Sequence, residues 1–182
     1  MSDIADRYQR LADAFERKIA AVGSEQWSQQ SPCEAWTARG VVDHVVEVHG
    51  MMLGQIDRRL SEPPVTDDPM AAFRSARADV EKVLGDPELA GTEYDGAFGR
   101  TNIAATIDQF LGFDLVVHGW DLGRATGQDD TIDPSEVDRV WAFAQQLGDN
   151  LRRPQVCGPA VEVPGDASVQ DRLLALLGRN PS

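Results

Sequence analysis

The sequence predicts an all-α protein, a four-helix bundle with one extra helix and a short C-terminal tail. Two patterns carry this prediction. Apolar residues recur at spacings of three and four over long stretches, which is typical of amphipathic helices, and only one short stretch, VCGPAVEVPG, resembles a strand. The 182 residues are 42% hydrophobic and 26% charged, proportions of a globular chain that buries a core. We expect a single domain over residues 1–182.

The first helix is predicted over residues 3–22. Its apolar residues follow the period of one helix face. They are Ile4, Tyr8, Leu11, Phe15, Ile19 and Val22. Because alanines also lie around this helix, we expect its exposed face to pair with a second copy in a homodimer. These alanines are Ala12, Ala14, Ala20 and Ala21.

Two further helices are predicted after a loop rich in Ser and Gln. Thr37 is a suitable N-cap for a helix that runs to about Leu60. Asp68 followed by Pro69 is a typical cap and first residue for a helix that ends near Leu84. Residues 85–100 contain several glycines and predict a long loop.

The remaining helices complete the bundle and its tail. The fourth helix is predicted over residues 101–126 and ends at Gly127, a suitable C′ residue. Asp133 begins a fifth helix with a capping box. A short helix over residues 167–177 closes the chain.

Charge and composition exclude several classes of function. The chain has 17 Lys and Arg against 30 Asp and Glu, a net charge of −13. This charge argues against nucleic-acid partners and against an anionic membrane surface. The N-terminal segment has no apolar core of a signal peptide, and no apolar run approaches a membrane span. We therefore expect a cytoplasmic protein whose two cysteines are reduced.

Polar residues on the core face of the fourth helix are the first functional signal. Asp114 and His118 lie four residues apart near the centre of its apolar stripe, and Asp121 shares that face. A buried carboxylate is unfavourable unless it is paired or bound to a cation. The helix alone leaves two interpretations open: two ligands of a divalent metal, or a buried Asp–His pair without metal.

A third ligand would come from the second helix, which carries the two other histidines. His49 lies nearer the centre of the apolar face, and His44 lies at its edge. Periodicity alone favours His49. A lone histidine on an apolar face is nevertheless more often a core residue than a ligand.

Three segments together resemble the DinB-like superfamily, and within it the metal-binding domain of mycothiol-dependent maleylpyruvate isomerase. The segments are PCEAWTARGVVDHV, DLVVHGWDLGRATG and DASVQDRLLALLGRNP. The resemblance implies a DinB-like four-helix bundle that holds a divalent metal, zinc first, with nickel or iron as alternatives. It selects His44, eight residues after Trp36, with Asp114 and His118 as the other ligands, and leaves His49 as a pocket-wall residue or an alternative ligand.

Two departures from the isomerase limit this resemblance. The isomerase has Glu where this chain has Asp114, and it carries a second, α/β domain that contributes to its active site. We therefore do not expect maleylpyruvate isomerisation.

The resemblance implies chemistry on thiols. Three protein ligands leave coordination positions open, and an open metal site can activate a bound thiol. We expect an S-transferase-like or isomerase-like enzyme that adds mycothiol, or a bacillithiol-type thiol, to a small electrophilic substrate. The alternatives are a non-catalytic metal-binding or stress-response bundle and a purely structural helical domain.

Several neighbours of the predicted site have two interpretations each. Asp121 is either a hydrogen-bond partner of a ligand histidine or a surface carboxylate. Trp120 and Arg124 are either pocket residues or, as we favour, packing and surface residues. Cys33 is either, as we favour, a packing residue of the turn before Trp36 or a redox thiol.

Overall fold

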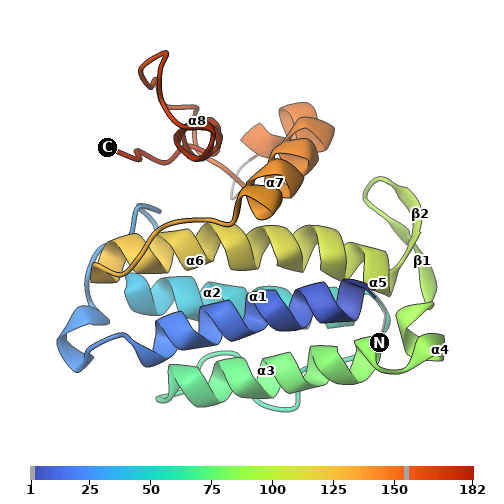
Figure 1. Cartoon of the computed structure of the whole chain (residues 1–182). Coiled ribbons are helices and arrows are strands. Elements are labelled where there is room, and N and C mark those ends of the chain that lie inside the picture. The colour runs from blue at the N-terminus through green and yellow to red at the C-terminus, as the bar shows by residue number, and fades with distance from the viewer. Residues whose placement is uncertain (1–2, 154–155) are drawn as a thin grey trace. The chain divides into compact units, whose positions relative to one another are not determined.

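The structure, a computed structural model, describes residues 3–153 and 156–182. It is predominantly helical, with one small β-hairpin (Figure 1), which confirms the all-α prediction. The chain divides into two compact units, Met1–Gln128 and Asp129–Ser182. A single domain over residues 1–182 stays a prediction.

The first unit contains a four-helix bundle. Its members are α1 (Asp3–Ala20), α2 (Ala38–Gly54), α3 (Pro69–Leu84) and α6 (Gly112–Thr126). Helix α1 contacts α3 and α6, and α2 contacts the same two helices, so each member packs against two neighbours (Figure 1). Apolar stripes from all four helices form the core, where the rings of Phe15 and Phe73 lie 5.1 Å apart.

Most of the predicted helix ends are confirmed by their caps. The Thr37 side chain accepts a hydrogen bond from the Gly40 amide at the start of α2. The Asp68 side chain accepts from the Ala71 amide at the start of α3. Helix α6 ends at Gly127, whose φ of 68° is the left-handed conformation that glycine adopts without strain.

Helix α2 is shorter than predicted. It ends at Gly54, and a turn follows whose last residue, Asp57, has a left-handed φ of 57°. Leu60 then packs against the helix at Gly50: a Cβ added to Gly50 would lie 3.2 Å from the Leu60 Cδ1. The apolar period that extended the prediction to Leu60 is therefore satisfied by a loop residue folding back onto the helix.

The predicted loop over residues 85–100 contains regular structure. It holds α4 (Pro87–Ala90) and the first of two antiparallel strands, β1 (Glu93–Gly96) and β2 (Gly99–Asn102). A two-residue turn joins the strands, and Gly99 has a φ of 106°. The predicted helix over 101–126 therefore begins later, with Asn102 as the N-cap of α5 (Ile103–Thr106).

A π-helical segment, η2 (Ile107–Leu111), joins α5 to α6. One short 3₁₀ turn, η1 (Ser24–Gln26), lies in the loop between α1 and α2. None of the helices within residues 3–153 and 156–182 is long and apolar enough to cross a bilayer.

The second unit contains the extra helix and the tail. Helix α7 (Pro134–Leu147) begins at the predicted cap Asp133, and η3 (Gly148–Arg152) follows it. Helix α8 (Val169–Leu176) lies within the predicted 167–177. The strand-like segment VCGPAVEVPG forms no strand. Within it, the Val161 amide donates to the carbonyl of Ala175, in the last turn of α8.

Candidate metal centre

Local structure at the start of α2 sets the place of His44. Two side chains hold the turn before the helix by donating hydrogen bonds to the Trp36 carbonyl. They are the Ser31 hydroxyl (2.7 Å) and the side-chain Nε2 of Gln30 (2.9 Å). Gly40 lets the indole fold back over the first helical turn, since a Cβ there would lie 3.0 Å from the Trp36 Cβ. The Trp36 ring then stacks on the His44 ring, with centroids 4.1 Å apart and planes 22° from parallel.

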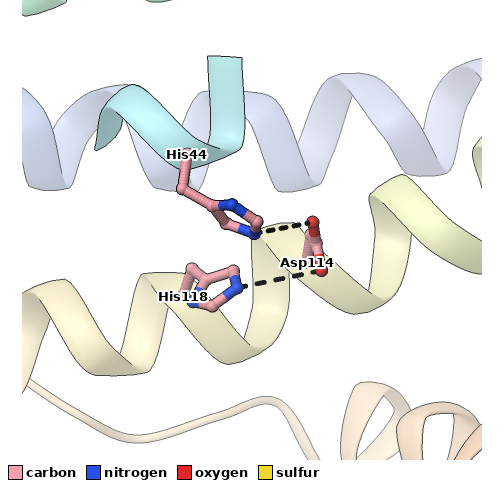
Figure 2. Close-up of side chains that lie close together, drawn as sticks. All are labelled: His44, Asp114 and His118. Carbon is pink, nitrogen blue, oxygen red and sulfur yellow. Dashed lines mark ion pairs between the residues drawn. The ribbon is translucent and has the colours of Figure 1, made fainter. Parts of the chain in front are cut away.

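Helix α6 brings two further donors to His44 (Figure 2). Asp114 and His118 are one helical turn apart and point from α6 toward α2. The His44 Nε2 lies 3.7 Å from Asp114 Oδ2, and the His118 Nε2 lies 3.8 Å from Asp114 Oδ1. The two imidazole rings meet edge to face at 4.9 Å.

These three side chains have the composition and spacing of a divalent-metal site. One ligand atom from each lies within 4.8 Å of the others. Ligands about 2.1 Å from a tetrahedral zinc ion stand about 3.4 Å apart. The two carboxylate–imidazole distances are slightly wider than that and run to different oxygens of Asp114. The side chains would have to move inward to bind one metal together.

Asp121 orients His118. The His118 Nδ1 lies 2.9 Å from Asp121 Oδ2, and Asp121 is fully buried. Because the carboxylate accepts the Nδ1 proton, the lone pair of the neutral ring is on Nε2, which faces Asp114. This arrangement is the one in which histidine commonly binds metal, and it excludes the alternative of Asp121 as a surface carboxylate.

His49, which periodicity favoured, does not join this group. Its Nδ1 lies 2.7 Å from the Val45 carbonyl and its Nε2 lies 2.9 Å from the Tyr8 hydroxyl. A carbonyl only accepts, so Nδ1 carries the proton and Nε2 accepts from Tyr8. Burial lowers the pKa of His49 to about 4 and raises that of the Tyr8 hydroxyl well above its ordinary value. His49 is therefore a neutral core residue with both ring nitrogens hydrogen-bonded.

The remaining predicted neighbours of the site are packing and surface residues. Trp120 is buried, and the exposed Arg124 lies over its ring at 5.3 Å. The Cys33 carbonyl accepts from the Trp36 amide and so belongs to the turn. The contact that sequence reasoning missed is Trp36 itself, which covers His44. The sequence feature that could have predicted this contact is Gly40, four residues after Trp36, which leaves room for the indole.

Comparisons with known proteins identify the family of the chain. The family model described as the mycothiol maleylpyruvate isomerase N-terminal domain matches residues 8–123, which include all three donors. Two uncharacterised proteins of Mycobacterium tuberculosis, from strains CDC 1551 / Oshkosh and ATCC 25618 / H37Rv, are each 29% identical to the chain over 178 residues. The matches cover 94% of this chain and 95% of each relative. No solved structure matches.

Proposed function

This chain belongs to the mycothiol maleylpyruvate isomerase N-terminal domain family, and we propose that it binds one divalent metal and uses it in chemistry on a low-molecular-weight thiol. The observation that supports this most is the group formed by His44, Asp114 and His118, whose ligand atoms lie within 4.8 Å of one another. Two imidazoles and one carboxylate suit zinc, and also nickel or iron(II).

Each residue has a distinct role in the proposed site. His44, Asp114 and His118 hold the metal, and three protein ligands leave a position open to a small molecule. Asp121 fixes the ring orientation of His118, and Trp36 limits the movement of His44 by stacking. A divalent metal in such a site lowers the pKa of a bound thiol.

The substrate of the proposed reaction is a thiol of the mycothiol or bacillithiol type. The thiol releases its proton to solvent, and the thiolate sulfur adds to a double-bonded, electrophilic carbon of the second substrate. The π bond of that carbon breaks, and the atom at its other end takes up a proton from solvent. The family name supports mycothiol as the first thiol to test. We place the reaction in the cytosol, where thiols are kept reduced.

Titration calorimetry with mycothiol tests this function. The zinc-loaded protein is expected to bind mycothiol and to release a proton on binding, because the thiolate is the form that binds metal. His118→Ala is expected to lose this binding, and His49→Ala, which alters a histidine outside the site, is expected to retain it. Consumption of an electrophile in the presence of mycothiol then separates an enzyme from a binding protein.

Two outcomes contradict the proposal in different ways. Zinc binding without mycothiol binding supports the non-catalytic metal-binding bundle. Absence of zinc binding supports the structural interpretation, in which Asp114 and His118 form a buried polar pair.

A further inference from the structure

A wide helical turn immediately precedes the proposed metal ligands of α6. In η2 (Ile107–Leu111) the Gly112 amide hydrogen-bonds to the carbonyls three and five residues back, those of Gln109 and Ile107. A π turn inserts about one residue into an α-helix and often lies at a functional site. Asp114 follows this turn by only three residues.

The apolar sequence favours the wide turn. Ile103, Ile107, Leu111 and Leu115 are all buried and follow one another at a strict spacing of four. In an α-helix each residue turns by about 100°, so over the twelve positions from Ile103 to Leu115 the side-chain direction would shift by about 120°. One inserted residue removes most of this rotation, so the π turn keeps all four side chains on the core side.

A buried arginine from α1 holds this turn. The Arg7 Nη1 lies 2.6 Å from the Asp108 carbonyl oxygen and 2.8 Å from its Oδ1. Arg7 is 5% exposed, so its charge is compensated inside the protein rather than by bulk water. The guanidinium thus binds both the backbone and the side chain of one residue in the π turn.

Gly112 provides the space for the guanidinium. A Cβ added there would lie 2.9 Å from the Arg7 Nη2 and closer still to Nη1. Any other residue at this position would displace Arg7 from the turn. Arg7, Asp108 and Gly112 therefore form one clamp, called here the α1–η2 clamp.

We propose that Arg7 is a positioning residue of the metal site and that the α1–η2 clamp sets the direction of Asp114. Loss of the wide turn would rotate the following helix by about 100° and turn Asp114 and His118 away from His44. Because α1 carries the arginine, the bundle itself fixes the register of α6. This inference rests on the proposed metal site.

Zinc affinity, measured by competition with a chromogenic chelator, tests the clamp. Arg7→Met is expected to weaken zinc binding by about tenfold to 100-fold, as other residues that orient ligands do, and Arg7→Lys is expected to restore part of it. Arg77→Met is the matched control. Arg77 binds Asp13, Glu16 and Glu81 between α1 and α3, so its loss removes a comparable ion-pair network without touching η2.

The visible spectrum of Co²⁺ bound to the same variants reports ligand geometry independently of stability. Arg7→Met is expected to change this spectrum, and Arg77→Met is expected to leave it as in the wild type. Should Arg7→Met fail to fold, Asp108→Asn removes the charge of the partner and is expected to change affinity and spectrum in the same direction. Wild-type affinity and spectrum in all folded clamp variants would overturn the inference alone, whereas a wild type that binds no zinc would overturn the proposed function as well.

Discussion

Asp121 decides which nitrogen of His118 is available to a metal. Its carboxylate accepts the Nδ1 proton at 2.9 Å, inside a fully buried environment. Asp121→Asn is expected to weaken zinc binding by about tenfold, because the amide nitrogen of Asn can face Nδ1 and favour the other tautomer. Chelator competition measures this change. Asp43→Asn is the control, since Asp43 pairs with Arg39 on α2, and equal affinities in both variants would contradict the assigned role.

His49 makes the stability of the protein depend on pH. Its pKa is about 4 in the folded state, because of burial, against an ordinary 6.5. As pH falls from 6.5 toward 4, the unfolded chain takes up a proton at His49 that the folded chain does not. The free energy of unfolding is therefore expected to fall by about 3 kcal/mol over this window from His49 alone.

Urea unfolding at a series of pH values measures this contribution. Other groups titrate in the same window, so the relevant quantity is the difference between wild type and His49→Gln. The Gln amide does not titrate and offers an oxygen to the Tyr8 hydroxyl. The variant is expected to lose stability less steeply below pH 6.5, and parallel curves would show that His49 does not titrate in this way.

Periodicity and resemblance answered different questions about the two histidines of α2. Periodicity identifies residues that face the core, and His49 does face it, beside Tyr8 and Phe73. His44, Asp114 and His118 lie together instead where α2 meets α6, away from the centre of the apolar face of α2. A helical wheel of α2 alone does not show this contact with α6. The resemblance selected His44 by its spacing from Trp36, and in the structure the indole is stacked on the His44 ring.

At the scale of elements, prediction succeeded where caps and apolar spacing agreed. Helix α3 has the predicted bounds, with Asp68 as its cap. The hairpin of β1 and β2 was missed because its strands have four residues each and little apolar alternation. The π turn was missed because residues 101–126 were predicted as one continuous α-helix.

Glycines at two helix ends are expected to respond oppositely to the same substitution. Gly127→Ala is expected to destabilise the protein by about 1 kcal/mol, because its φ is 68°. Gly54→Ala, in the last turn of α2 with no atom within 4 Å of an added Cβ, is expected to stabilise by up to about 1 kcal/mol. Thermal unfolding of both variants measures the signs, and equal signs would contradict the assigned helix ends.

At the scale of the whole molecule, the predicted homodimer depends on the outer side of α1. Ala12 is fully buried within the bundle, whereas Ala20 and the following Ala21 are exposed. A dimer contact made through these alanines would therefore lie at the C-terminal end of α1. Light scattering at micromolar concentration is expected to report twice the chain mass of 19.9 kDa, and a monomer mass would remove the prediction.

Zinc stoichiometry in matched histidine variants tests the central claim most directly. Equilibrium dialysis of the wild type, His44→Ala, His118→Ala and His49→Ala gives the metal content of each, with circular dichroism to verify that the helices remain. The proposed site predicts one zinc ion per chain in the wild type and in His49→Ala, and loss of most of it in His44→Ala and His118→Ala. Metal that survives His44→Ala and falls with His49→Ala, or that is unchanged in every variant, would contradict the account.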